Sequence, residues 1–450
     1  MKSKSLPNTV RHSLGLLIVL MAFFWMSPGS LAQTQPVEKK ATVSGQVVDA
    51  QGTPLVSQLI FTNEVSLLRI NTDLFGRFKT QLPLGDYTVE VSKGPLYERR
   101  NLALSVPDRS PVYLDDITLA KLYETPWMAG DLHQHTAYSF DGSNSPFEVY
   151  VSDLSVGLDF GVVTDHNDVH ADSEFIYGDQ DGFIALPGIE ITTNRGHFNA
   201  IDFSRVVNPD TDRGASSIQR ILGDVRTDPQ ALLQINHPDR ADSGTAFLDW
   251  SLAGQFDLME VWNGKRLPPY VIGEPNQKTL ERWIRMIKNG LYLPATGGSD
   301  NHDISGNLLF EQTVFATEDE QYFNQSMFSG SPRTYVLPQS RTAEGILTAL
   351  RQGHSFITNN PLVDLTVQGA IPGDTIAPGD VTVHVQIRSN RALTAYRLRV
   401  SGADAPWEPI SGNVFETEIP LTLYGGDFVL LEVRGEHGDY AFTNPVFAAY

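Results

Sequence analysis

The 450-residue chain contains no cysteine. No disulfide can therefore stabilise the fold, no thiolate can bind a metal ion, and no lipid can be attached at an N-terminal cysteine. Basic residues are also scarce: 33 Lys and Arg stand against 53 Asp and Glu, and the net charge is −20. Because such an acidic surface repels nucleic acid and anionic lipid, neither is expected as a partner.

Long hydrophobic runs are missing except near the N-terminus. Residues 1–32 combine a basic start, the apolar run LGLLIVLMAFFW and a small-residue end, SPGSLA. This pattern is typical of a secretory signal peptide, so we expect export to the periplasm or the extracellular space. The run is shorter than the about twenty residues of an ordinary membrane span, so no stable span is expected after its removal. Retention of the segment as an anchor is the alternative.

The rest of the chain has the composition of a folded protein and is long enough for several domains. Residues 41–122 contain short alternating segments such as GDYTVEV between turns, which predicts a small β-sandwich. Its pattern resembles the carboxypeptidase-regulatory-like domains that are often attached to secreted enzymes. Residues 361–450, with VTVHVQIRS and FVLLEVRG, predict a second β-sandwich. We expect these two domains to offer surfaces for glycans or other proteins.

Residues 123–360 have a different sequence pattern, in which short apolar runs alternate with amphipathic helical segments. This alternation predicts βα units around a parallel sheet or barrel. The first helix, at 145–157, should begin with a capping box formed by Ser145 and Glu148. Its expected buried face is Phe147, Tyr150, Val151 and Leu154. Further helices are expected at 276–290 and 342–353, each ended by a glycine.

Polar side chains follow the apolar runs of this middle domain. The runs lead into DLHQHT, TDHN, GIEI, INHP, MEVWNG and GGSDNH. Because the carboxyl ends of the strands of a βα barrel face one side, these residues should converge. His133 and His135 are two apart and would share one strand face. Imidazole and carboxylate without thiolate suit zinc, manganese or iron(II). Any one of these motifs alone more often contains ordinary surface or core histidines than metal ligands.

Together, these motifs resemble those of the PHP (polymerase and histidinol phosphatase) family, in particular the metallohydrolases related to bacterial carbaryl hydrolases. The resemblance covers the middle domain only. It implies a distorted seven-stranded βα barrel, here flanked by two small β-sandwiches, with two or three divalent ions at its mouth. It implies nine metal ligands in three positions: His133, His135 and Asp300; Glu190, His197 and His237, with Glu190 bridging to the first; and Asp141, His166 and His302.

Four other residues are assigned supporting roles. Asp165 is expected to orient His166 or a neighbour by a hydrogen bond, with capping of the next helix as the alternative. Asn263, Lys265 and Arg195 are expected to contact the substrate. Arg240 and Arg266 are further cations that could recognise a phosphate.

The expected activity is hydrolysis of a small-molecule ester by metal-bound hydroxide. No serine or cysteine with a convincing catalytic partner competes with this mechanism. Phosphoesters are the favoured substrates, because the family resemblance favours them. Amides, carbamates and carboxyl esters remain the alternative on the same site. A protein that uses metal only for stability, and that binds other molecules at the cell envelope, is the alternative of a different class.

Overall fold

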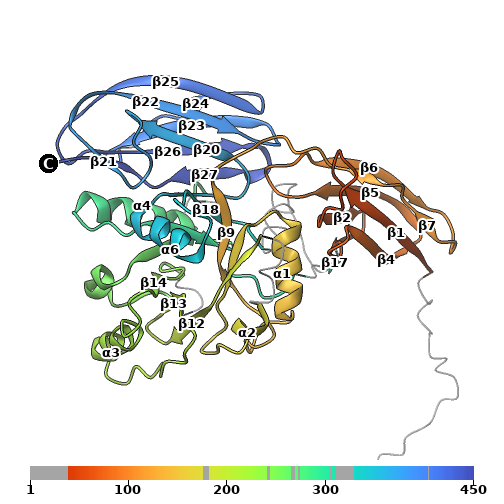
Figure 1. The fold of residues 1–450 in the computed structure, drawn as a ribbon, viewed down its shortest axis with the longest axis horizontal. Helices are drawn as coiled ribbons and strands as arrows, with labels where there is room; N and C mark the ends of the chain where they lie inside the picture. The colour runs from red at the N-terminus through yellow and green to blue at the C-terminus, as the bar shows by residue number, and fades with distance from the viewer. Residues whose placement is uncertain are drawn as a thin grey trace, which may run out of the picture. The chain divides into compact units, whose positions relative to one another are not determined.

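The computed structural model describes residues 39–175, 182–240, 244–264, 269–271, 274–304, 307–309, 329–403 and 405–450 (Figure 1). The expected signal peptide lies outside these ranges. Residues Lys40–Tyr450 form one compact unit. None of the helices in the described ranges combines the length and hydropathy that a bilayer-spanning helix needs. The fold is mixed α/β, and sheets dominate it.

The N-terminal segment of this unit is all β. Its strands are β1 (Lys40–Val48), β2 (Gln58–Thr62), β3 (Ser66–Asn71), β4 (Arg77–Pro83), β5 (Gly85–Ser92), β6 (Arg100–Val106), β7 (Val112–Tyr113) and β8 (Ile117–Thr118). β4, β1, β7 and β8 form one sheet, and β3, β2, β5 and β6 lie in a second. Alternate residues such as Val43, Phe61 and Val89 are buried in a shared core, as the period of two along a half-buried strand requires.

The middle segment mixes strands with helices. Its elements are β9 (Met128–Gln134), α1 (Pro146–Ser155), β10 (Phe160–Val163), α2 (Asp172–Phe175), β11 (Ile184–Leu186), β12 (Gly188–Thr193), β13 (Gly196–Ile201), α3 (Ala215–Val225), β14 (Leu232–Ile235), a 3₁₀ helix (Trp250–Gln255), β15 (Leu258–Asn263), α4 (Pro275–Lys288), β16 (Ala295–Gly298), β17 (Asn307–Leu309), β18 (Arg333–Val336), α6 (Ala343–Gln352) and β19 (Ser355–Thr358). β17 pairs with β3 of the N-terminal segment.

These strands belong to two sheets. In the first, β11, β10 and β9 are parallel, and β18 then pairs antiparallel with β9. In the second, β12, β13 and β14 are antiparallel neighbours, and β14, β15 and β16 are parallel. Isolated parallel bridges, Gln134 to Asn301 and His166 to Glu190, join the two sheets where their strands end. A closed barrel of seven strands stays a prediction.

The helices follow most of the sequence pattern. The predicted capping box of α1 is confirmed: Ser145 accepts from the Glu148 N–H, and the Glu148 carboxylate accepts from the Ser145 N–H. Of the expected buried face of α1, Tyr150 is confirmed and Phe147 is wrong: Phe147 is 58% exposed, because the helix turns Val149 toward the core instead. α4 buries one apolar face, made of Leu280, Trp283, Ile284 and Ile287, and α6 ends at Gly353 in a left-handed conformation, as expected.

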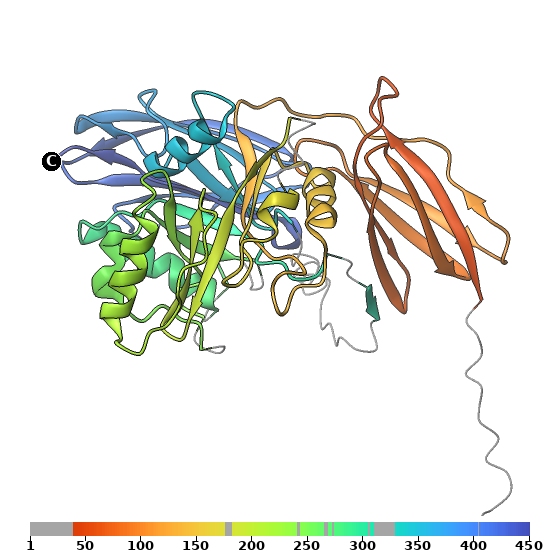
Figure 2. The same cartoon turned by 60° about the horizontal axis from the view of Figure 1, so that its bottom comes forward.

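The C-terminal segment contains β20 (Leu362–Val367), β21 (Thr375–Ile376), β22 (Gly379–Arg388), β23 (Leu393–Val400), β24 (Glu408–Pro409), β25 (Val414–Leu423), β26 (Phe428–Gly435), β27 (Tyr440–Thr443) and β28 (Val446–Ala448). β20, β22 and β25 form one layer of the blue region in Figures 1 and 2. Val383 of this layer and Leu431 of β26 share a core. The second layer is continuous with the middle segment, because β19 pairs with β27.

Candidate metal centre

The ends of strands from both middle sheets bring the predicted ligands together. His133 lies on β9 and His135 directly after it, while His166 follows β10. Glu190 and His197 lie on the hairpin β12–β13, where Thr192 pairs with His197, so that Glu190 and His197 share one face. The remaining predicted ligands follow strands or lie in loops of the same region: Asp141, His237, Asp300 and His302.

Glu190 is at the centre of this arrangement and is fully buried. Its Oε1 lies 3.3 Å from His133 Nε2, 3.2 Å from His197 Nδ1 and 3.3 Å from His237 Nε2. Its Oε2 lies 2.6 Å from His166 Nδ1. One carboxylate is therefore shared by imidazoles from four different parts of the chain.

Asp300 is a second carboxylate around which imidazoles gather. Its Oδ1 lies 3.1 Å from His135 Nε2 and 3.5 Å from His133 Nε2. Its Oδ2 lies 3.2 Å from the amide of Asn263 and 3.3 Å from the guanidinium of Arg240. Asp300 therefore connects the histidines of β9 with polar groups of two other loops.

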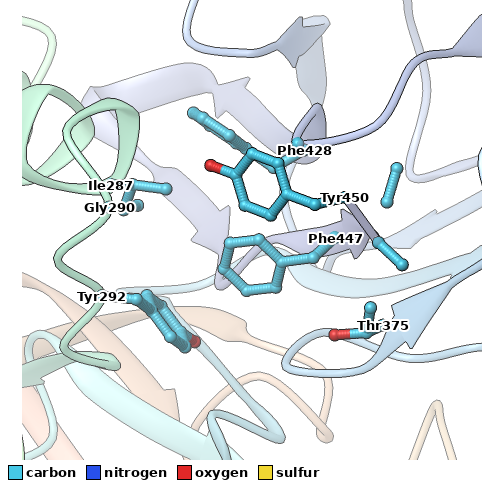
Figure 3. Close-up of a pocket in the computed structure, with 10 residues that line it drawn as sticks. Ile287, Gly290, Tyr292, Thr375, Phe428, Phe447 and Tyr450 are labelled. Carbon is cyan, nitrogen blue, oxygen red and sulfur yellow. The ribbon is translucent and has the colours of Figure 1, made fainter.

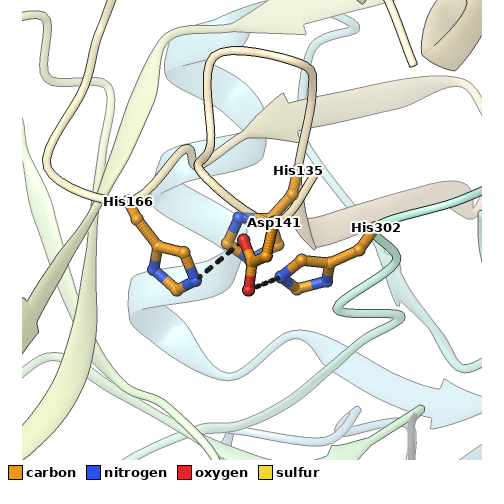
Figure 4. A group of neighbouring side chains, drawn as sticks. All are labelled: His135, Asp141, His166 and His302. Atoms are coloured by element: carbon orange, nitrogen blue, oxygen red, sulfur yellow. Dashed lines mark ion pairs between the residues drawn. The ribbon is translucent and has the colours of Figure 1, made fainter. Parts of the chain in front are cut away.

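Asp141 forms the most exposed part of the arrangement (Figure 4). Its carboxylate lies between two imidazoles, with Oδ1 3.6 Å from His166 Nε2 and Oδ2 3.1 Å from His302 Nε2. The rings of His135 and His302 are stacked with centroids 4.0 Å apart. The Asp141 side chain is 40% exposed, whereas the His135 side chain is inaccessible to solvent.

The potential ligand atoms fall into four groups, within each of which all atoms lie within 4.8 Å of one another. The groups are His135, Asp141, His166 and His302; His133, His135 and Glu190; His133, His237 and Asp300; and His166, Glu190 and His197. All nine residues that the sequence singled out as ligands are present. The partition differs from the one implied by the resemblance, because His237 is grouped here with His133 and Asp300.

The chemistry of these residues fits divalent cations. Within the described ranges, four buried atoms of the cluster make no hydrogen bond: Nε2 of His133, Nε2 of His135, Oε2 of Glu190 and Nδ1 of His237. Three of these atoms still lie close to a group of the cluster: His133 Nε2 is 3.3 Å from Glu190 Oε1, His135 Nε2 is 3.1 Å from Asp300 Oδ1, and Glu190 Oε2 is 2.6 Å from His166 Nδ1. Imidazole nitrogen and carboxylate oxygen are ligands of zinc, manganese and iron. The arrangement could therefore hold divalent metal.

Burial and neighbouring charge shift the pKa values of these groups in opposite directions. Burial alone would raise the pKa of Glu190, but the imidazoles of His197 and His133 hold it well below its usual range. Burial lowers the pKa of His135 well below the ordinary value, and burial also lowers that of His237. Glu190 is thus charged and these two imidazoles are neutral, which are the forms that bind metal.

Two further carboxylates orient His133 and His135 from the ring sides that face away from the cluster: Glu260 accepts a hydrogen bond from His133 directly, and Asp165 acts on His135 through Ser139. His133 Nδ1 donates to Glu260 at 3.1 Å, so Nε2 is the ring nitrogen that faces Glu190 and Asp300. His135 Nδ1 donates to Ser139 Oγ at 2.9 Å, and Ser139 donates in turn to Asp165 at 2.8 Å. Both histidines therefore present Nε2 to the cluster.

Asp165 acts through Ser139 rather than by direct contact with the His166 ring. Its carboxylate also accepts from the backbone N–H and the hydroxyl of Thr136, at 2.7 and 2.6 Å. Ser139 Oγ accepts from the N–H of His166 at 3.0 Å. The sequence analysis did not identify Ser139, and it did not identify Glu260 as a partner of His133. The available signal for Glu260 was an acidic residue inside an apolar strand.

Backbone conformation near the cluster is strained. His237 and Asp300 both have positive φ, at +26° and +50°. Residues other than glycine rarely adopt such values, and they concentrate at functional sites. The surrounding structure holds these two side chains in place at a cost to stability.

The expected substrate residues lie in different surroundings. Asn263 is buried and donates to Glu260 as well as to Asp300. Arg195 makes a two-pronged ion pair with Asp249, at 2.8 and 2.7 Å. Lys265 and Arg266 lie outside the described residues. Arg240, through Asp300, is a cation placed directly against the cluster.

A cavity of about 240 Å³ lies elsewhere, beside the C-terminal end of α4 (Figure 3). Its wall is mainly aromatic, from Tyr292, Phe428, Phe447 and Tyr450, and none of the nine candidate ligands lines it. The residues suited to metal chemistry are therefore not in this cavity.

No family model and no curated protein matches the chain. A two-domain protein from Bacteroides vulgatus that contains a predicted PHP-like metal-dependent phosphoesterase is similar in structure, at 18% identity and TM-score 0.40, over 69% of this chain and 92% of that one. A candidate metal-dependent phosphoesterase from Bifidobacterium adolescentis has 17% identity and TM-score 0.28, over 40% of this chain and 91% of that one. An amidohydrolase from Chromobacterium violaceum, with bound sulfate and no metal, has 16% identity and TM-score 0.28, over 40% of this chain and 90% of that one. At these identities and TM-scores, neither a shared fold nor a shared activity follows from the likeness.

Proposed function

We propose that this protein is a metal-dependent hydrolase whose substrates are phosphoesters. The observation that carries the proposal is the meeting of six histidines and three carboxylates in overlapping groups, several of whose buried atoms make no hydrogen bond. A closed structural zinc site needs only four ligands. The larger set supports a site for more than one ion.

Divalent ions held there would activate water at neutral pH and stabilise negative charge on the attacked group. The residues of the chain supply the arrangement for this chemistry. Glu190 is placed to be shared between neighbouring ions, because its two oxygens contact different histidines. Glu260 and Ser139 fix the ring orientations of His133 and His135.

Arg240 is the observation that favours phosphoesters over neutral esters and amides. Its guanidinium contacts Asp300 at 3.3 Å, and its side chain is 19% exposed. Arginine at this position could hold a phosphate oxygen, because its planar donors match phosphate geometry. A neutral amide or carboxyl ester would gain less from this charge.

The first test is elemental analysis of the purified protein, followed by a panel of phosphate monoesters, phosphate diesters, carboxyl esters, amides and carbamates. We expect bound metal and turnover of phosphoesters. Turnover of amides or carboxyl esters without turnover of phosphoesters would show that the protein is the alternative kind of hydrolase. A metal-loaded protein inert to the whole panel would contradict enzymatic function and favour a binding protein.

The second test uses variants. His133→Ala and Glu190→Ala should lose metal and turnover while keeping the circular dichroism spectrum of the parent. His384→Ala is the matched control, because this histidine pairs with Glu416 in the C-terminal segment. Equal metal content in all three variants would contradict the assignment of the centre.

We also propose that the protein is exported and that its β segments contact glycans or other proteins. The support for export is the pattern of residues 1–32: a basic start, an apolar run and a small-residue end. N-terminal sequencing of protein from the cell envelope and the medium tests it. Recovery of full-length protein only from the cytoplasm would contradict export.

A further inference from the structure

A short loop after β9 places exposed aromatic side chains beside the candidate metal centre. Phe140 is 83% exposed, and Tyr138 is 40% exposed. The residue after Phe140 is Asp141, a member of the group with His166 and His302. Large apolar side chains that remain exposed next to a site are candidates for ligand contact.

Phe140 has one covered face and one open face. Its ring is stacked on the imidazole of His166, with centroids 5.0 Å apart and planes at 20°. Because most of the side chain is exposed, the opposite face is accessible. Tyr138 is held differently: its ring is stacked on His170 and its hydroxyl donates to Glu174. Phe140 is therefore the ring available to a ligand.

The loop that carries Phe140 is tightly held. The N–H of Ala137 donates to Asn144 O at 2.7 Å, and the N–H of Ser143 donates to His302 O at 3.0 Å. Gly142 lies so close to Thr136 that an added Cβ would be 1.9 Å from its carbonyl oxygen. The backbone that carries the exposed ring is thus fixed before any ligand arrives, which reduces the entropy lost on binding.

The exposed fractions of the side chains show where solvent reaches the cluster. Glu190 and His133 are inaccessible to solvent, the side chains of His197 and His302 are 10% and 13% exposed, and that of Asp141 is 40% exposed. Solvent therefore meets the cluster at Asp141, next to Phe140. A substrate group that projects outward past Asp141 would reach the exposed phenyl ring of the neighbouring residue.

We propose that Phe140 is a specificity-determining residue that stacks on a flat aromatic group of the ester substrate, such as an aryl or nucleoside group. This inference rests on the proposed hydrolytic function and adds its substrate class. Aromatic rings in offset or edge contact gain more than their buried area alone provides, which favours a planar group over an alkyl group of similar size.

The test measures binding of four small anions to the metal-replete protein by calorimetry: phenylphosphonate, methylphosphonate, benzoate and acetate. We expect phenylphosphonate to bind roughly fivefold to tenfold more tightly than methylphosphonate. Phe140→Leu should reduce this ratio to about one to two, and Phe140→Trp should keep it. Phe147→Ala is the matched control, because Phe147 is also exposed but contacts Tyr150 rather than a candidate ligand. It should keep the parent ratio.

The two pairs of anions separate this proposal from the proposed function. A ring preference for benzoate over acetate, without phosphonate binding, would support the role of Phe140 and contradict the phosphoester assignment. Absence of a ring preference in both pairs would overturn the role of Phe140, as would a preference that Phe140→Leu retains. Metal content is measured in each variant, and Phe140→Leu keeps an apolar side chain against His166.

Discussion

Glu260 lies behind His133, with Oε1 3.1 Å from Nδ1 of the imidazole. The other carboxylate oxygen accepts from the backbone N–H of His237 at 2.8 Å. One buried acid therefore orients two candidate ligands from different strands. Carboxylates in this position typically raise the basicity of a metal-binding histidine and fix its tautomer.

We expect Glu260→Gln to lower metal affinity about 10- to 100-fold, because the amide keeps the volume but not the charge. Competition with a chromophoric chelator measures the affinity. Glu416→Gln, on an exposed strand of the C-terminal segment, is the control and should have no effect. Unchanged affinity in Glu260→Gln would show that the ring of His133 is held by other contacts.

Removal of metal should destabilise the protein, because the cluster would keep its buried charges without a compensating cation. A ligand present at about a hundredfold its Kd stabilises the folded state by about 2.7 kcal/mol. Because the entropy of unfolding grows with size and residues Lys40–Tyr450 form one unit, we expect a chelator to lower Tm by only about 3 °C, and added metal to restore it. Differential scanning calorimetry measures both steps. An unchanged Tm after proven metal loss would contradict the expected contribution of bound metal to the stability of the folded protein.

Gly142→Ala should disturb the loop that carries Asp141. The new Cβ would meet the backbone carbonyl of Thr136 at 1.9 Å, so the chain must shift. We expect a loss of about 1–3 kcal/mol in unfolding free energy and less metal bound per chain. Urea unfolding and elemental analysis measure the two effects.

The matched control is Gly223→Ala in α3, where an added Cβ has no neighbour within 4 Å. Alanine in a helix should stabilise by about 0.5–1 kcal/mol. Equal effects of the two substitutions would contradict the close approach at Gly142.

The raised pKa of the buried Asp172 predicts that the stability of the protein depends on pH. Burial raises its pKa from 3.8 to about 7. Between these values the folded state binds more protons than the unfolded state, so stability should fall as pH rises and become level above about 7. Asp172→Asn keeps an acceptor for the Gly188 N–H, which is 3.2 Å away, and should remove this part of the slope.

Urea unfolding of metal-depleted parent and variant, at pH values from about 4.5 to about 8, measures the difference between the two slopes. Parallel pH profiles would show that the folded protein does not hold this proton.

Local sequence signals predicted the parts of the site that depend on short-range geometry. The spacing of His133 and His135 predicts that their side chains lie on the same face of a strand. The Ser145–Glu148 pair predicts where α1 begins. The turn around Gly196, with φ of +123° and only 2.8 Å between an added Cβ and Phe247, brings His197 back along β13.

Long-range pairing was harder to predict. Phe147 fits the apolar periodicity of its helix, yet the core lies on the side of Val149 and Tyr150. Periodicity alone could not tell which of two adjacent apolar stripes meets the sheet. The role of Glu260 depends on the neighbouring parallel strands, and no local pattern gives the distance from its carboxylate to His133.

The pairing of β19 with β27 connects the C-terminal segment to the sheet that carries His133. β19 has β18 on one side and β27 on the other, and β18 pairs with the strand that carries His133. Removing the residues after 360 would leave the edge of β19 that pairs with β27 without a partner. Its unpaired N–H and C=O groups could then pair with another chain. The last ninety residues therefore complete the sheet that carries His133, and a chain shortened there should aggregate instead of folding as a smaller protein.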